Sequence, residues 1–203
     1  MELRNILNLA AAYEAFQIGF GFSGARRTAI ADYLPLKPGQ RVIDIGCGPG
    51  KILTYLPEGI DYIGFDIDQK YIDHANATYA GRGRFYCRPF DAACADEFGP
   101  ADAVMFNGVL HHLDDALADT LLGHAFTALK PGGSIFTLDG CYRDGQNPLA
   151  RKLLDMDRGQ FVRHQEQYEA LLGKHFKDRK SNIREDMSRL PYTFIVMTGR
   201  KPA

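Results

Sequence analysis

The feature that most limits how this chain can fold is a regular alternation of strand and helix signals. Short apolar runs rich in β-branched residues predict buried strands at 42–45, 62–67 and 103–109, and two further strands are predicted at 84–90 and 134–140. Segments with helical periodicity separate these runs. Strands joined through helices of this length form right-handed βαβ units, so we expect an α/β fold with a mostly parallel sheet.

Two of the connecting helices can be delimited from the sequence. One is predicted between the second and third strands and ends near Gly81. The other lies between the fourth and fifth strands, begins at a capping carboxylate, Asp114 or Asp115, and ends at the turn 131–133. Its predicted apolar stripe consists of Leu117, Leu121, Leu122, Ala125, Ala128 and Leu129.

The two ends of the chain differ from this alternating core. Residues 1–35 are predicted to form two helices, with Tyr13, Phe16 and Phe20 on a shared face that is either ordinary core or a lid over a ligand. A polar stretch follows the fifth strand and leads to a helical region that reaches about Leu172. The segments 176–186 and 192–200 are then predicted to be a pair of antiparallel strands.

Composition limits the class of protein. The chain has 203 residues, 45% hydrophobic and 24% charged, which is typical of a single globular domain. A formal charge of −1 does not indicate a nucleic-acid partner. The four cysteines lack the spacing of metal ligands, so we expect no metal site and reduced thiols. With neither a signal-peptide core nor an apolar stretch long enough to span a membrane, the expected location is cytoplasmic, with no membrane partner.

The segment Asp44-Ile-Gly-Cys-Gly-Pro-Gly50 is the most informative part of the sequence. It leaves a predicted strand and enters a short helix, at the sheet edge where α/β proteins bind ligands. Glycines at 46, 48 and 50 lack the Cβ atoms that would keep a ligand away from the backbone. The carboxylate of Asp44 either stabilises this turn or binds a cationic ligand.

A second carboxylate, Asp66, lies at the end of the second predicted strand. In that position it can accept hydrogen bonds from both hydroxyls of a ribose, or it can cap the next helix, although Asp68 is the better cap. A dinucleotide site would need a third glycine where this chain has Lys51. A nicotinamide-dependent oxidoreductase is therefore an unfavourable alternative.

Four segments together resemble a known family. The pattern D-x-G-x-G-x-G at 44–50 resembles motif I of class I S-adenosylmethionine-dependent methyltransferases, and 64–68 resembles their acidic second motif. The segments 106–115 and 129–140 resemble those around the fourth and fifth strands of the small-molecule branch. The four segments keep the family's order and spacing, so the resemblance is more specific than a lone glycine turn.

The resemblance implies a fold, a cofactor and a set of contacts. The fold would be a three-layer α/β/α sandwich around a seven-stranded sheet of order 3-2-1-4-5-7-6, with the last strand antiparallel. The cofactor would be S-adenosyl-L-methionine, with S-adenosyl-L-homocysteine as product. The methionine portion would lie near Asp44, Gly46, Cys47, Gly48 and Asn107, the ribose at Asp66, and the adenine near Ile67, Asp91 and Ala92. A loop aspartate in contact with solvent is the other interpretation of Asp91.

Candidate catalytic groups follow the fourth and fifth predicted strands. Methyl transfer needs alignment and exclusion of water, and a base only if the acceptor must lose a proton. His112 and His111 are the predicted bases, with His112 preferred, and Asp139 could orient the acceptor. Alternatively the histidine pair is structural, with one ring buried and hydrogen-bonded and the other on the surface.

The acceptor is expected to be a small molecule. Residues 107–110 lack the [DN]-P-P-[YFW] pattern that methyltransferases acting on nucleobases or glutamine amides resemble. We expect one domain over 1–203, in which 1–35 is a helical cap, 36–140 binds the cofactor, and 141–203 forms the acceptor pocket and a terminal hairpin. The protein would be a monomer or a homodimer. A protein that binds S-adenosylmethionine without catalysis is the remaining alternative.

Overall fold

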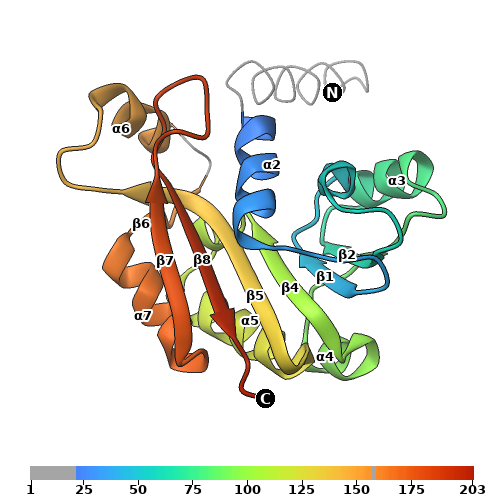
Figure 1. Ribbon diagram of the computed structural model, residues 1–203. Helices are drawn as coiled ribbons and strands as arrows, with labels where there is room; N and C mark the ends of the chain where they lie inside the picture. The colour runs from blue at the N-terminus through green and yellow to red at the C-terminus, as the bar shows by residue number, and fades with distance from the viewer. Residues whose placement is uncertain (1–21, 157–158) are drawn as a thin grey trace.

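A computed structural model describes residues 22–156 and 159–203 (Figure 1). The predictions for the N-terminal aromatic residues Tyr13, Phe16 and Phe20 therefore lie outside the described residues. The strands are β1 (Arg41–Ile45), β2 (Asp61–Asp66), β3 (Gly83–Cys87), β4 (Ala101–Asn107), β5 (Leu129–Tyr142), β6 (Arg163–His164), β7 (Asp178–Arg184) and β8 (Phe194–Arg200). The helices are α2 (Phe22–Tyr33), α3 (Gln69–Thr78), α4 (Ala92–Phe98), α5 (Asp115–Ala128), α6 (Pro148–Asp155) and α7 (Gln165–His175), with 3₁₀ turns η1 (Lys51–Tyr55) and η2 (Leu110–His112).

The strands form one sheet in the order β3-β2-β1-β4-β5-β8-β7, and β8 runs antiparallel to both of its neighbours. Since β7 and β8 are the sixth and seventh strands of the expected fold, the predicted order and the antiparallel last strand are confirmed. The predicted hairpin at 176–186 and 192–200 corresponds to these two strands. The two-residue strand β6 is an addition that pairs in parallel with the end of β5.

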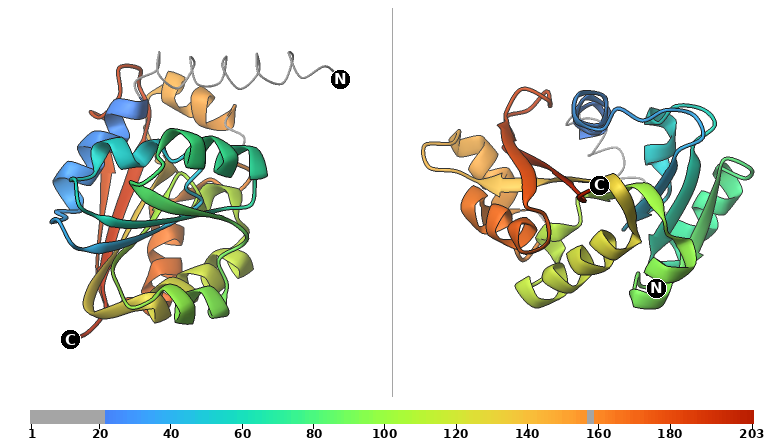
Figure 2. Two further views of the ribbon diagram at one scale, coloured as in Figure 1. Left: turned by 90° about the vertical axis from the view of Figure 1, so that its right-hand side faces the viewer. Right: turned by 60° about the horizontal axis from the view of Figure 1, so that its bottom comes forward.

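Helices cover both faces of the sheet, as the right-hand view of Figure 2 shows. On one face α4, α5 and α7 pack over a buried core that includes Phe65, Phe106 and Leu122. On the other face α2, η1, α3 and α6 enclose a second core that includes Tyr62 and Phe136. The expected three-layer sandwich is confirmed. Since the central strands are apolar on both sides, the polar groups of the sheet concentrate at the strand ends.

Aspartates begin three of the helices. Asp68 accepts a hydrogen bond from Lys70 N at the start of α3, and Asp91 accepts one from Cys94 N at the start of α4. Asp114 caps α5, which settles the choice between Asp114 and Asp115. A carboxylate in this position satisfies a backbone N–H that has no acceptor within the helix.

Three details of the secondary-structure prediction are wrong. Helix α5 ends at Ala128, before the turn 131–133, because the chain becomes extended at Leu129 and pairs with Ala101 of β4. The turn lies in an irregularity within β5. Leu117 is 48% exposed and does not belong to the buried stripe of α5. The helical region before Leu172 is two helices, α6 and α7, with β6 between them.

Truncation of Leu122 to alanine is expected to lower the free energy of unfolding by about 2–5 kcal/mol, since its side chain is fully buried under the sheet. Leu117→Ala on the same helix is the matched control and should cost less than about 1 kcal/mol, because that side chain is half exposed. Urea denaturation of both variants measures the difference. Equal losses of unfolding free energy in the two variants would contradict the assignment of Leu122 to the buried face of α5 and of Leu117 to its exposed face.

Candidate active site

The glycine-rich turn after β1 is held against the end of β2 by its backbone. Gly46 N and Cys47 N both donate to the carbonyl of Phe65, at 2.8 and 2.9 Å. Gly50 N donates to Cys47 O at 3.1 Å and closes the turn before η1. The short helix that the sequence indicates after this turn is the 3₁₀ turn η1. The bend therefore has a fixed position at the carboxyl ends of β1 and β2.

Two of the glycines in this turn are needed for different reasons. Gly46 has a φ of 75°, and a Cβ atom there would lie 2.5 Å from Cγ2 of Val109 in the loop after β4. Gly48 has a φ of 53°, but no atom of the described structure lies within 4 Å of the position its Cβ would take. Gly46 is thus required by packing within the protein. At Gly48 the backbone borders open space where a ligand can approach it.

Cys47 lies between these glycines and points into the protein. Its thiol is buried against β2, where a Cβ atom on Gly64 would lie 2.8 Å from the sulfur. Burial raises the pKa of the Cys47 thiol, and the nearby carboxylates of Asp44 and Asp66 add to this. The side chain is therefore an inert packing group, and only the backbone of Cys47 belongs to the turn.

Asp66 at the end of β2 bonds to the same turn. Its Oδ2 accepts from Gly48 N at 2.8 Å and its Oδ1 accepts from Asp68 N at 2.9 Å. Because each carboxylate oxygen has two lone pairs, both oxygens retain acceptor capacity for further donors. The role of helix cap, which the sequence left open for Asp66, belongs to Asp68. The next residue, Ile67, is 78% exposed beside this carboxylate.

Asp44 in β1 is buried behind the turn. The hydroxyl of Tyr62 donates to its Oδ2 at 2.5 Å, whereas its Oδ1 has no hydrogen-bond partner among the described residues. Burial raises the pKa of Asp44 to about 7, and the negative charge of Asp66 acts in the same direction. The hydrogen bond from Tyr62 and the positive charge of Arg26 partly oppose the rise. A cation bound beside Asp44 would favour its ionised form.

Arg26 on α2 is a site residue that the sequence analysis missed. Its charge acts on Asp44, and its Nη2 lies 3.9 Å from the position of a Cβ atom on Gly108, in the loop after β4. Helix α2 lies on the α3 side of the sheet (Figure 1), so that it crosses this end of the strands. No motif marks Arg26, because its importance comes only from where α2 packs.

Two further polar side chains at this end of the sheet have unsatisfied atoms. Asn107 ends β4, and neither its amide oxygen nor its amide nitrogen has a hydrogen-bond partner in the described part of the chain. The same is true of Oδ2 of Asp139, near the end of β5. Buried polar atoms of folded proteins are nearly always paired, so such a group needs a ligand or water. Together with Asp44, these atoms form a candidate polar binding site.

His111 and Asp139 form a buried pair. The Nδ1 atom of His111 lies 2.7 Å from Oδ1 of Asp139, and the backbone N–H of His111 donates to the same oxygen at 3.2 Å. His111 is 7% exposed, whereas His112 is exposed and its ring centroid lies 4.1 Å from that of His111. The arrangement of one buried and one surface ring matches the structural alternative for the pair. It is also the geometry in which a carboxylate orients an imidazole for proton transfer.

Asp91 and Ala92 lie at the start of α4. Oδ1 of Asp91 accepts from Cys94 N at 2.9 Å, and this hydrogen bond is the main reason that the pKa of Asp91 is lowered. Ala92 is the first residue of the helix, so its N–H has no acceptor within α4. Both residues are exposed. The structure thus assigns Asp91 a capping role, and its contact with a ligand stays a prediction.

Several basic residues gather between positions 174 and 180, away from this site. Lys174 pairs with Asp119 on the surface, and Arg179 and Lys180 are exposed on the edge strand β7. A cavity of about 350 Å³ beside them is lined by residues of α7, β7 and β8 and by none of the candidate cofactor or catalytic residues. Within residues 22–156 and 159–203 there is no helix long and apolar enough to cross a membrane, and no cluster of three potential metal ligands.

Comparison with known proteins agrees with this geometry. A family described as "Methyltransferase domain" matches residues 22–176. The chain belongs to this family. The match begins with α2 and ends at the last residues of α7, so the methyltransferase domain includes the glycine turn, Asp66, Asn107 and the His111–Asp139 pair.

Individual relatives are more distant. A phosphoethanolamine N-methyltransferase of Triticum aestivum is 31% identical over 147 residues, which cover 64% of this chain and 27% of that protein. The chain thus spans about a quarter of the length of the first curated relatives it matches.

Solved structures show the same fold. Phosphoethanolamine N-methyltransferase 2 of Haemonchus contortus, solved with phosphomonomethylethanolamine and S-adenosylhomocysteine, superposes with a TM-score of 0.66 at 19% identity, over 88% of this chain and 52% of that one. The [4+2]-cyclase SpnF has a TM-score of 0.69 at 18% identity, over 87% and 80% of the two chains. These likenesses establish the Rossmann-like methyltransferase fold, and the cyclase shows that the fold alone does not fix the reaction.

Asp44 predicts a pH dependence of stability. Because its pKa is raised to about 7 in the folded protein, from about 4 when unfolded, the folded state binds the proton more tightly. Its contribution to stability is therefore full below about pH 4 and falls as the pH rises to about 7. We expect Asp44→Asn to flatten this part of the stability curve in chemical denaturation. Asp144→Asn, the same change at an exposed site, is the control and should leave the curve unchanged.

Proposed function

We propose that this domain transfers the methyl group of S-adenosylmethionine to a small-molecule acceptor. The observation that carries the proposal is the bond between Asp66 and Gly48, because it sets a carboxylate beside an open stretch of glycine backbone at the end of two parallel strands. Membership of the methyltransferase-domain family supports the same conclusion. The unsatisfied atoms of Asp44 and Asn107 lie at the same end of the sheet.

Residues of this chain fit the three parts of the proposed cofactor. The second lone pairs of Asp66 can accept from the ribose hydroxyls, and exposed Ile67 offers an apolar surface for the adenine, whose other proposed contacts are Asp91 and Ala92. The buried Oδ1 of Asp44 and the amide of Asn107 can pair with the ammonium and carboxylate of the methionine portion. Gly46, Cys47 and Gly48 let the backbone lie against it. When bound, S-adenosylmethionine supplies a methyl group that is already activated for displacement.

His111 is the proposed base. Oδ1 of Asp139 accepts from the backbone N–H of His111, and we take it as the acceptor for Nδ1 of the same residue as well. Nε2 is then the nitrogen that takes a proton from the methyl acceptor. As the acceptor atom forms its bond to the methyl carbon, its proton passes to His111, and Asp139 stabilises the resulting imidazolium. This assigns to buried His111 the role that the sequence analysis favoured for exposed His112.

The acceptor pocket is proposed to lie between the turn that carries His111 and the segment after β5. Two side chains at the end of β5 have protein partners: Tyr142 donates to Asp155 at 2.9 Å and Arg143 to Glu185 at 3.1 Å. The named relatives include enzymes that act on phosphoethanolamine, which supports a small acceptor with an amine or hydroxyl group.

Binding without catalysis is the remaining alternative. A protein that only binds S-adenosylmethionine would need the same cofactor contacts. It would have no need for the His111–Asp139 pair, which includes one of the unsatisfied polar atoms, Oδ2 of Asp139. A nicotinamide-dependent oxidoreductase stays unfavourable, since Lys51, not glycine, follows the turn at the start of η1. Release of S-adenosylhomocysteine in the presence of small amines and alcohols separates methyl transfer from both alternatives.

Gly48→Val is expected to weaken binding of S-adenosylmethionine at least tenfold, because the new side chain would fill the space beside Asp66. Gly132→Val is the matched control: its φ is 73°, it also has no atom within 4 Å of its Cβ position, and it lies at the opposite end of β5. Both variants carry the same backbone strain. Titration calorimetry should show the loss only for Gly48→Val. Equal affinities in the two variants would mean that the cofactor binds elsewhere.

His111→Ala is expected to lower kcat at least a hundredfold for an acceptor that must lose a proton, with little change in cofactor affinity. His112→Ala should lower kcat less than threefold, because that ring lies on the surface. Initial-rate measurements with a coupled assay for S-adenosylhomocysteine test both. A larger loss of kcat in His112→Ala than in His111→Ala would identify His112 as the base instead.

A further inference from the structure

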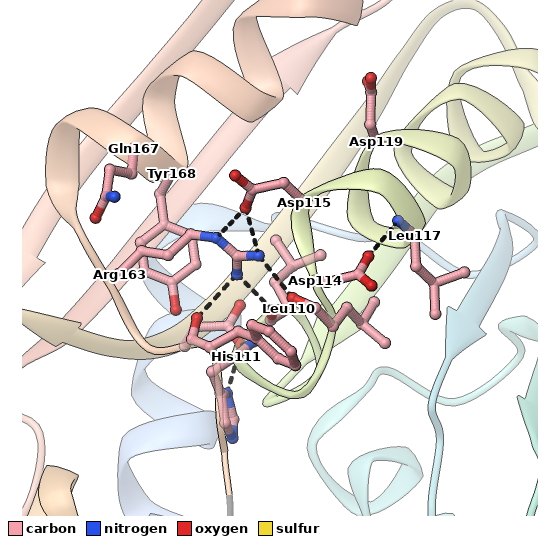
Figure 3. A network of polar contacts seen from close by, with 12 residues as sticks. Leu110, His111, Asp114, Asp115, Leu117, Asp119, Arg163, Gln167 and Tyr168 are labelled. Carbon is pink, nitrogen blue, oxygen red and sulfur yellow. Dashed lines mark hydrogen bonds and ion pairs between the residues drawn. The ribbon is translucent and has the colours of Figure 1, made fainter.

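A second buried charged side chain lies close to His111. Arg163 in β6 is 5% exposed, and Figure 3 shows its guanidinium surrounded by oxygen atoms from the turn η2 and the start of α5. Its Nη1 donates to Leu110 O at 2.8 Å, and its Nη2 donates to Leu113 O at 2.6 Å. These carbonyls lie on either side of the two histidines in the sequence. The guanidinium therefore fixes both ends of the turn that presents His111.

Arg163 also holds the segment that lies against the imidazole. Its Nη1 donates to Phe161 O at 2.9 Å, and Phe161 N donates to His111 O at 2.9 Å. A Cβ atom on Gly159 would lie only 2.1 Å from Cδ2 of His111, so the backbone of this glycine packs directly on the ring. The chain from Gly159 to Arg163 thus forms one wall around His111.

The same arginine is attached to the strand that carries Asp139. In β6 it pairs with Cys141 of β5, two residues after Asp139. Its guanidinium lies 5.6 Å from the centre of the Tyr168 ring, and the Tyr168 hydroxyl donates to Gly140 O at 3.0 Å. Arg163 therefore joins the turn of His111 to the strand of its carboxylate partner.

The ion pair of Arg163 with Asp115 does not explain this burial. Nε of Arg163 lies 2.9 Å from Oδ1 of Asp115, but the Asp115 side chain is 78% exposed and water screens such a pair. The hydrogen bond to Leu110 O is buried and those to Phe161 O and Leu113 O are partly buried. Together they use the fork of donors that only arginine has. Lysine at this position would supply a single ammonium group and could not bridge the same oxygens.

We infer that Arg163 is a positioning residue that sets His111 in register with Asp139 for proton transfer. It acts through the carbonyls of Leu110, Leu113 and Phe161 and contacts no reacting atom. The inference rests on the proposed role of His111 as base. It adds a residue of β6 to a site whose other residues lie in or before β5 in the sequence.

Arg163→Met is expected to lower kcat at least tenfold while the Kd for S-adenosylmethionine stays within twofold, because no cofactor residue touches the guanidinium. Arg163→Lys should show a smaller loss, of more than threefold. Asp115→Asn removes the ion pair but keeps the three carbonyl contacts, and should lower kcat less than threefold. A loss for Asp115→Asn as large as for Arg163→Met would overturn the inference in favour of a simple ion pair.

A double-mutant cycle with His111→Ala tests whether Arg163 acts through the imidazole. In the His111→Ala background, measured by single turnover, Arg163→Met or Arg163→Lys should change the residual rate less than twofold. An equal loss in both backgrounds would show that Arg163 acts on something other than His111. If Arg163→Met does not fold, the cycle is measured with Arg163→Lys.

A spectroscopic measurement separates this inference from the proposed function. The proton between Nδ1 of His111 and Asp139 should give a downfield NMR signal, identified by its loss in His111→Ala. The signal should broaden or shift in Arg163→Met but not in Asp115→Asn. An unchanged signal in Arg163→Met overturns the inference. Full activity of His111→Ala, with the signal still sensitive to Arg163, would instead refute the base and leave the positioning intact.

Discussion

The whole site depends on how the bend after β1 is attached to the end of β2. Phe65 accepts two backbone hydrogen bonds from the bend with its carbonyl, and Asp66 accepts a third with its side chain. Because the two strands are parallel and paired in register, Asp44 pairs with Gly64 and lies in the same part of the sheet. A single polar region therefore contains one carboxylate open to donors and another that is buried. In the proposed site, this contrast in environment would let the two aspartates serve different parts of the cofactor.

The catalytic half of the site is built by a different principle. His111 comes from a short turn, which has little intrinsic rigidity, so its position must be imposed from outside. Asp139 holds one ring nitrogen, and the segment that ends at Arg163 packs on the ring and on the turn. The cofactor region is thus fixed by neighbouring strands, whereas the proposed base is fixed by a segment about fifty residues later in the sequence.

The sequence predicted the parts of the protein in which local chemistry decides the structure. The parallel strands, the caps and the glycine bend have signatures in their own residues, and the strand order followed from the family resemblance. It favoured His112 as the base, whereas the proposed base is His111, because the contacts that distinguish the two rings come from the distant residues Asp139 and Gly159. Arg26 and Arg163 gave no signal, since an arginine in a polar segment has the same pattern whether it is buried or exposed. The end of α5 was misplaced because pairing with Ala101 overrode the turn residues 131–133.

The position of β6 has a consequence for how such a domain can change its substrate. Between the end of β5 and Arg163 the chain makes a long excursion that includes α6, and β6 then brings it back beside the strand it left. Insertions or deletions confined to residues 143–156 would leave the pairing of β6 with β5, and the wall from Gly159 to Arg163, in place. If this segment borders the acceptor, as proposed, new acceptors would be accommodated by such changes, in evolution or by engineering, without disturbing the turn after β1, provided that the returning arginine is retained.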